Sequence, residues 1–245
     1  FGVVAPGVDE NGKPHKVRLY SVACPSAGED GKGKHVSTTP KRLIDEFWPQ
    51  GPNDPKDKHT LFLGVCSNHL CDLEPGDDVL VAGPNGRRFL LPVNPADHDF
   101  IFLATGTGIA PFRAFVKHLY KNVPEWKGTI TLFYGARSGL ELLYMNDEND
   151  DFTQYYDRDT FQAFKALSPR PSWSAPIDWD GALSERGEEL WGLLGQPHTY
   201  VYIAGLEKMR GELDDAFAEI AGSDQKWARR KAELMAGGRW VELLY

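Results

Sequence analysis

The stretch of sequence that decides the fold is Phe100-Ile101-Phe102-Leu103-Ala104-Thr105-Gly106-Thr107-Gly108-Ile109-Ala110-Pro111-Phe112-Arg113. An apolar run ends in a turn of glycine and threonine, and an apolar-periodic segment follows at once. This pattern predicts a buried strand, a tight loop and a helix with Pro111 near its first turn. The loop suits the pyrophosphate or nicotinamide end of a nucleotide, because glycines allow close approach and a helix start favours negative charge. A structural turn without a ligand fits the same residues, and Pro111 stands where the dinucleotide fingerprint has a third glycine.

Composition places the chain among globular proteins of one or two domains, with 245 residues, 41% hydrophobic and 25% charged. A net charge of −8 argues against generic binding to nucleic acid or to anionic membranes. Apolar runs are all too short to cross a bilayer, so we expect no transmembrane segment. The three cysteines are too few for a disulfide framework and favour a reducing compartment, so we expect a cytoplasmic protein.

A metal site has little support in the sequence. The spacing of Cys66 and Cys71 matches the first two cysteines of a plant-type iron–sulfur motif. The third cysteine of that motif would stand at position 74, which is Glu74. His69 lies between the two cysteines, yet no second ligand pair follows. We therefore expect no bound metal.

Residues 1–95 are dominated by short β-branched and aromatic runs between Gly/Pro turn clusters. The runs predict strands at 1–5, 17–23, 60–65 and 79–82, with one more strand and a short helical segment within 34–54. Many short strands with little helix predict an antiparallel barrel or sandwich as the first domain.

Residues 96–245 alternate strand and helix, and the polar segment 94–99 marks the boundary before this second domain. We predict strands at 100–104, 129–134, 164–168, 199–204 and 239–245, and helices at 111–121, 183–194, 207–221 and 227–235. Alternating strands and helices predict a parallel sheet with right-handed crossovers, in which ligands bind at the carboxyl ends of the strands. The candidate loops 105–108, 137–138, 168–170 and 205–209 each follow a strand. Arg137 and Arg170 could clamp a phosphate, although each could equally be a solvated surface arginine.

Two segments of the first half carry chemistry. Period-2 alternation puts Arg18 and Tyr20 on one face of a strand, and Ser21 adds a hydroxyl. A cation beside an aromatic ring suits a phosphate next to a flat ring, but an ordinary amphipathic strand has the same pattern. The second segment, 64–70, could begin a helix whose N-terminus binds a phosphate. A capped helix with no ligand fits the same residues.

Together these stretches resemble the plant-type ferredoxin–NADP⁺ reductase family, over essentially the whole chain. The resemblance rests on residues 11–21, 64–68, 70–73, 106–113 and 199–206 and on Tyr245. It implies an FAD-binding antiparallel barrel followed by a pyridine-nucleotide-binding α/β domain. It also implies an enzyme that takes a hydride from NADPH onto FAD and passes single electrons to ferredoxin or another iron–sulfur protein or domain, or runs the reverse.

The resemblance assigns five residues of the first domain to FAD. Arg18 would hold the pyrophosphate, Tyr20 would stack on the isoalloxazine, and Ser21 would hydrogen-bond near its N5. Cys66 and Ser67 would line the flavin and its phosphates.

The resemblance assigns residues of the second domain to NADP(H). Thr107 and Gly108 would face the nicotinamide and pyrophosphate, and Ser168 and Arg170 would meet the adenosine 2′-phosphate. Gly205, Leu206 and Met209 would border the nucleotide, and Arg137 is a further candidate for its phosphates.

Catalysis would depend mainly on positioning and on tuning of the flavin. By the resemblance Tyr245 would cover the other face of the flavin and must move for the nicotinamide to stack, while Ser21 and Glu242 would assist the proton balance. The family's terminal Glu-x-Tyr is lengthened here by one residue between Glu242 and Tyr245, which leaves the place of Glu242 relative to the flavin open.

The chain departs from the family pattern elsewhere too. Asp45 stands where the family has an adenine-stacking tyrosine, with Phe47 or Trp48 as possible substitutes. Pro169 splits the family's Ser-Arg pair, and the later Lys-x-Tyr pair has no counterpart, so selection of NADPH over NADH has less support than nucleotide binding itself. Ala204 replaces a cysteine that the family usually has before Gly205.

The chain lacks an initiator methionine, and we expect it to begin within a longer protein, partway into the barrel.

Alternative functions remain open from the sequence. The chain could be a reductase module that feeds an oxygenase or epoxidase, or a non-catalytic nucleotide-binding module of the same fold. It could also be an interaction protein whose Lys13, Lys16 and Lys41 dock an acidic partner. Charge reversal at these lysines distinguishes the last case, because it would weaken ferredoxin reduction and spare reduction of a small dye.

Overall fold

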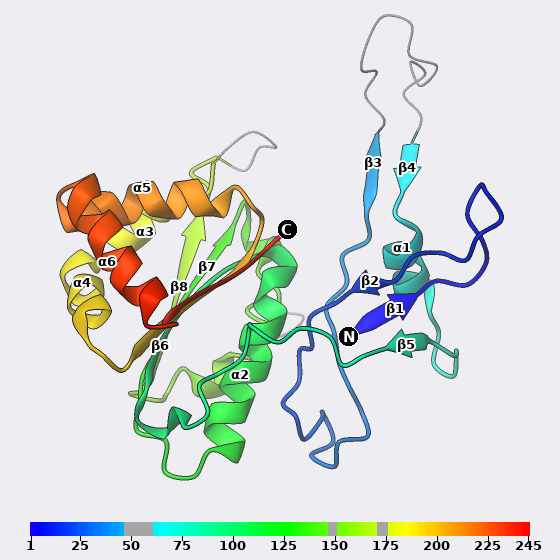
Figure 1. Ribbon diagram of the computed structural model, residues 1–245, viewed down its shortest axis with the longest axis horizontal. Coiled ribbons are helices and arrows are strands. Elements are labelled where there is room, and N and C mark those ends of the chain that lie inside the picture. Colours follow the sequence, from blue (N-terminus) through cyan, green and yellow to red (C-terminus); the bar gives the residue numbers. More distant parts are fainter. Residues whose placement is uncertain (47–60, 147–150, 171–175) are drawn as a thin grey trace, which may run out of the picture. The chain divides into compact units, whose positions relative to one another are not determined.

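The stretch from residue 99 to residue 122 folds as predicted (Figure 1). It forms strand β6 (Asp99–Thr105), a 3₁₀ turn η2 (Gly106–Gly108) and helix α2 (Ile109–Asn122). β6 is buried at every residue after Asp99, which is typical of a strand covered on both faces. Pro111 lies in the first turn of α2, where a missing N–H breaks no helical hydrogen bond.

The computed structural model describes residues 1–46, 61–146, 151–170 and 176–245. These residues divide into two compact units. The first unit consists of Phe1–Val22 and Thr38–Gly86, and the second of Ala23–Ser37 and Arg87–Tyr245. The candidate substitutes Phe47 and Trp48 lie outside the described residues, as does the rest of 47–54 in the segment expected to contain a strand and a short helix. The described part of that segment, 34–46, contains a strand and no helix.

The second unit is built on a five-stranded parallel sheet with the strand order β10-β9-β6-β7-β8. The other strands are β7 (Ile130–Ala136), β8 (Phe161–Leu167), β9 (Thr199–Gly205) and β10 (Trp240–Leu244). After β6 the chain adds β7 and β8 on one side, and it then returns to add β9 and β10 on the other. The predicted parallel sheet is therefore confirmed, and its switch point lies between β6 and β9.

Helices cover both faces of this sheet (Figure 1). On one face α2 packs through an aromatic core in which the rings of Phe102 and Phe112 stack with centroids 4.7 Å apart. The other face carries α3 (Trp179–Ser184), α4 (Gly187–Gly195), α5 (Met209–Ala221) and α6 (Asp224–Ala236). Helix α6 packs through Trp227 and Leu234, and the predicted terminal strand is present as β10, docked in the sheet beside β9.

The helix expected at 183–194 is in fact two helices. Asp178 starts α3 earlier than predicted, because its carboxylate accepts a hydrogen bond from the Gly181 N–H at 2.9 Å. Arg186 leaves helical geometry, with φ −127° and ψ 25°, and its guanidinium lies 4.1 Å from the ring centroid of Phe164. A break at this residue lets both helices pack on the sheet.

The first unit is antiparallel, as predicted. Strands β2 (Arg18–Leu19), β1 (Gly2–Val4) and β5 (Leu80–Ala82) form one sheet, and β3 (Ile44–Glu46) pairs with β4 (Leu61–Leu63). Helix α1 (Val65–Asp72) follows β4. A small core joins Val3, Ala5 and Cys66 with partly buried neighbours that include Tyr20 and Leu70. The strand expected at 17–23 is shorter than predicted: only Arg18 and Leu19 join the sheet, and Val22 makes one isolated bridge to Thr38.

Residues 23–37 belong to the second unit because a charge cluster holds them on α2. The Arg113 guanidinium donates to the Ala23 carbonyl at 2.6 Å, to Asp151 at 2.5 Å and to Glu29. Lys117 pairs with Glu29 at 3.0 Å. The side chains of Arg113 and Lys117 are each only 11% exposed, so these ion pairs are mostly shielded from water.

Short 3₁₀ turns complete the described chain: η1 (Pro95–Asp97), η3 (Gly139–Glu141) and η4 (Thr153–Tyr155). Among the described residues, none of the helices is both long and apolar enough to cross a membrane.

Candidate functional site

The loops that follow β6 and β9 meet at the switch point of the sheet. Gly106 has φ +51°, a left-handed conformation that glycine adopts without strain. Gly108 packs against β9, where an added Cβ would lie 2.7 Å from the Gly205 N and would collide with the Ala204 carbonyl. The two glycines are thus needed for different reasons, one for backbone conformation and one for space.

Thr105 joins the two loops through its buried hydroxyl. This hydroxyl donates to the Met209 Sδ at 2.9 Å and accepts from the Leu206 N–H at 3.1 Å. The sequence places Thr105 in the candidate loop 105–108 but assigns it no role of its own. A usable signal was present, because a hydroxyl at the end of a buried strand must find hydrogen-bond partners.

Tyr245 spans both loops. Its hydroxyl lies 2.7 Å from the Thr107 Oγ1 and also accepts a hydrogen bond from the Gly108 N–H. Its own N–H donates to the Gly205 carbonyl, and its carbonyl accepts from the Glu207 N–H, both at 3.0 Å. The structure therefore brings together six of the predicted residues at this crevice: Thr107, Gly108, Gly205, Leu206, Met209 and Tyr245.

Glu242 lies on the α5 side of β10 and does not join this group. Strand alternation puts it on the same face as Trp240, whose indole N–H donates to it at 2.7 Å. The Arg210 Nε of α5 donates to its other oxygen at 2.9 Å. These contacts anchor the last strand to α5, and a role for Glu242 in proton balance stays a prediction.

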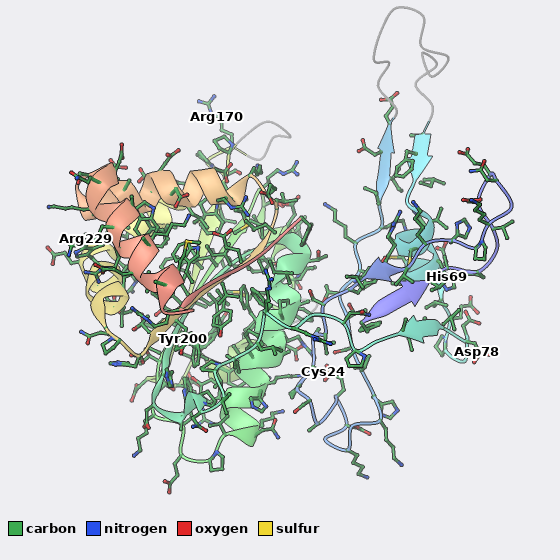
Figure 2. All side chains as sticks on the ribbon, in the orientation of Figure 1. Cys24, His69, Asp78, Arg170, Tyr200 and Arg229 are labelled. Atoms are coloured by element: carbon green, nitrogen blue, oxygen red, sulfur yellow. The ribbon has the colours of Figure 1, made fainter. Side chains whose placement is uncertain are left out.

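The second group of predicted residues follows β7 and β8. Arg137 comes directly after β7, and its backbone N–H donates to the Glu141 carboxylate at 3.0 Å. Ser168 comes directly after β8 and is buried, with its N–H bonded to the Ala136 carbonyl at 3.1 Å. Arg170 is exposed and extends outward at this end of the sheet (Figure 2). All three stand at the carboxyl edge of neighbouring parallel strands.

The first unit holds the residues predicted for the flavin. Arg18 is exposed on β2, and within the described residues no ion pair holds its guanidinium. Tyr20 is partly buried, and burial, then a hydrogen bond with Cys66, raise its pKa, so its hydroxyl stays neutral. The carbonyl of Ser21 accepts from the Thr38 hydroxyl at 2.8 Å.

Helix α1 begins beside this group without a side-chain cap. Gly64 is its N-cap, so the N–H groups of the first turn are not bonded by a capping side chain. The Ser67 hydroxyl donates to the Gly64 carbonyl at 3.2 Å and accepts from the Leu43 N–H at 3.1 Å. Ser67 therefore shapes the start of α1 through its side chain.

Comparisons with known proteins agree with this geometry. A sequence family described as "Oxidoreductase NAD-binding domain" matches residues 102–214. The chain is 37% identical over 247 residues to a ferredoxin–NADP reductase of Spirulina sp., with 98% of this chain and 80% of that protein covered. The chain belongs to the ferredoxin–NADP reductase family. The leaf isozyme 1 of ferredoxin–NADP reductase, chloroplastic, from Oryza sativa subsp. japonica is 38% identical over 262 residues, and this chain spans 66% of its length.

Solved structures of this family share the fold. The ferredoxin–NADP⁺ reductase of Plasmodium falciparum, solved with 2′P-AMP, aligns with a TM-score of 0.68 at 22% identity and covers 100% of this chain and 81% of that one. This likeness confirms the predicted two-domain architecture of an antiparallel β unit and a parallel α/β unit.

Proposed function

We propose that this ferredoxin–NADP reductase family member binds FAD and NADP(H) and moves electrons between NADPH and an iron–sulfur acceptor such as ferredoxin. The observation that carries the proposal is the meeting of the predicted nucleotide residues at the switch point of the parallel sheet, together with the family membership. No observation favours the alternatives of an oxygenase-feeding module or a non-catalytic nucleotide-binding module.

The second unit fits NADP(H). Gly106 leaves room for close approach of a ligand, and α2 starts nearby without a side-chain cap. The hydroxyl of Tyr245 already accepts the Gly108 N–H, which shows that this N–H points at a place that an oxygen atom can occupy. Arg137, Ser168 and Arg170 would meet phosphate groups at the neighbouring strand ends.

The first unit fits FAD. Arg18 offers an exposed guanidinium for the pyrophosphate, and Tyr20 offers a partly exposed ring for the isoalloxazine. Ser21 and Cys66 would lie near the ring, and Ser67 would keep the start of α1 in shape for phosphate. FAD, when bound, accepts a hydride and releases electrons singly.

The residues of this chain would act mainly by positioning. The switch-point loops would hold the nicotinamide, and Tyr245 would release Thr107 and Gly108 when the nucleotide enters. Ser21 and Glu242 are proposed to assist the proton balance. The three free cysteines support a reducing compartment, and a cytoplasmic location remains our prediction.

Reduction of a plant-type ferredoxin tests the proposal. The full chain is incubated with FAD, and ferredoxin reduction by NADPH is followed through cytochrome c, with ferricyanide as a small-dye acceptor. We expect FAD to remain bound after desalting and NADPH to reduce both acceptors. A protein that reduces the dye but not ferredoxin would contradict the proposed partner. A protein that does not retain FAD would contradict the proposed function itself.

A further inference from the structure

Tyr134 on β7 reaches from the core to the switch-point loop. Its side chain is fully buried, and its hydroxyl donates to the Gly106 carbonyl at 2.8 Å, with the Glu141 carbonyl as a longer second acceptor at 3.4 Å. In the sheet Tyr134 pairs with Ala104, two residues before Gly106, so its long ring extends forward to the turn. The sequence interpretation did not select this residue, although a tyrosine in a buried strand is expected to find a hydrogen-bond partner.

The Gly106 carbonyl is held from two directions. Besides the Tyr134 hydroxyl, it accepts from the N–H of Ile109 at the start of α2. A peptide unit is planar and trans, so its C=O and the next N–H point in opposite directions. By holding the carbonyl, Tyr134 turns the N–H of Thr107 away from the core.

The hydrogen bond from Tyr134 matters because Gly106 has no side chain that could help to fix its backbone. Gly106 has φ +51°, and among the described residues other than its two chain neighbours no atom lies within 4 Å of the place where a Cβ would be. Glycine is the residue with the greatest conformational freedom, so a turn built on it needs outside contacts to remain in one geometry. The hydroxyl of Tyr134 supplies such a contact.

We propose that Tyr134 is a positioning residue of the nucleotide site, which orients the Gly106–Thr107 peptide so that the N–H groups of the loop face the bound nucleotide. This inference rests on the proposed function, because it assigns the nucleotide to the switch-point loop. Tyr134 does not touch the nucleotide and acts through Gly106. Burial also raises the pKa of Tyr134, so the hydroxyl remains a neutral donor across the usual range of pH.

Tyr202 provides a matched control. It is buried on β9 in the same aromatic core as Tyr134, and its hydroxyl also donates to a backbone carbonyl, that of Leu90 at 2.7 Å. Tyr134→Phe and Tyr202→Phe each remove one buried hydroxyl and leave the ring. Both variants should therefore lose a similar amount of stability, while only one loses a contact to the loop.

The experiment compares wild type with both variants as full chains. NADP⁺ affinity is measured by calorimetry, and hydrogen exchange is followed at the amides of Thr107 and Gly108 without nucleotide. We expect Tyr134→Phe to weaken NADP⁺ binding about fivefold to tenfold and to speed exchange at both amides by a similar factor. We expect Tyr202→Phe to match wild type in both measurements and to match Tyr134→Phe in its loss of thermal stability.

The outcomes separate this inference from the proposed function. If wild type binds NADP⁺ and Tyr134→Phe binds it equally tightly, the positioning role is overturned while the function stands. If wild type does not bind NADP⁺, the proposed function fails and the role of Tyr134 at a nucleotide site fails with it. In either case, unchanged exchange at Thr107 and Gly108 in Tyr134→Phe would show that its hydroxyl does not hold the loop.

Discussion

Gly108→Ala is expected to remove nucleotide binding and to destabilise the second unit. The new Cβ would collide with the Ala204 carbonyl and would lie 2.7 Å from the Gly205 N, and both are backbone atoms of a central strand. A flexible side chain could move aside, but this strand is held on both sides by parallel neighbours. We expect a loss of about 3 kcal/mol or more in the free energy of unfolding, measured by urea denaturation.

The same substitution should lower NADP⁺ affinity by about tenfold to a hundredfold, since the loop would shift and misplace N–H groups that bind a charged ligand. Gly106→Ala is the matched control, two residues away. Its Cβ would lie more than 4 Å from every described residue beyond its two chain neighbours, so the substitution should cost only about 1 kcal/mol through the left-handed conformation. A Gly108→Ala protein as stable as wild type would mean that the loop does not pack on β9.

Arg113→Met is expected to release residues 23–37 from α2 and to destabilise the second unit. The substitution keeps the length of the side chain but leaves Glu29 and Asp151 with Lys117 as their remaining cation in this cluster. Removing one partner of a shielded ion pair costs about 3 kcal/mol. Urea denaturation measures this loss, and proteolysis within 23–37 should become faster.

The ion pairs of Arg113 should also make the free energy of unfolding depend on pH in the acid range. Burial alone would raise the pKa of Glu29, but hydrogen bonds from Arg113, Ser37 and Lys117 outweigh it and lower the pKa to about 2. A carboxyl with a lowered pKa stabilises the folded state above its ordinary value near 4.5, and this contribution is lost as the pH falls toward about 2. The free energy of unfolding should therefore decline less between pH 4.5 and about 2 in Arg113→Met, because this variant lacks the main cation beside Glu29.

The control for this prediction is Arg229→Met. Arg229 pairs with Glu233 on the surface of α6, and its side chain is 84% exposed (Figure 2). An exposed ion pair contributes less than about 1 kcal/mol, so this variant should unfold like wild type. Equal losses in the two variants would show that the cluster at Arg113 is no stronger than an ordinary surface pair.

The sequence was sufficient for the parallel sheet because its strands are short apolar runs followed by turn residues. The run before Gly106 is buried throughout, and each predicted strand of the second half is present within a few residues. The break near Arg186 was not predicted; at this residue the guanidinium lies over the ring of Phe164, which comes from another element. A local pattern does not contain that contact.

The residues at the switch point were predictable in part. Glycines and threonines beside a strand end indicate a loop for a ligand, and the structure brings them together with Tyr245. The roles of Thr105 and Tyr134 depend on strand neighbours, such as the pairing of Tyr134 with Ala104, which a sequence does not reveal. Arg113 shows the same limit, because its partner Glu29 lies 84 residues away in the chain.

The position of Glu242 follows from strand alternation. Period 2 puts Glu242 on the face of Trp240, and this face packs on α5 and α6. An ion pair with a basic residue of a neighbouring helix was therefore a reasonable expectation.

The most direct test of the central claim is anaerobic mixing of the FAD-loaded protein with NADPH, followed through the visible absorbance of the flavin. The account predicts that the yellow colour is lost on mixing with a small excess of NADPH and returns when oxidised ferredoxin is added. A protein that binds FAD and keeps its full colour in excess NADPH would contradict the claim that this chain transfers a hydride from NADPH to flavin.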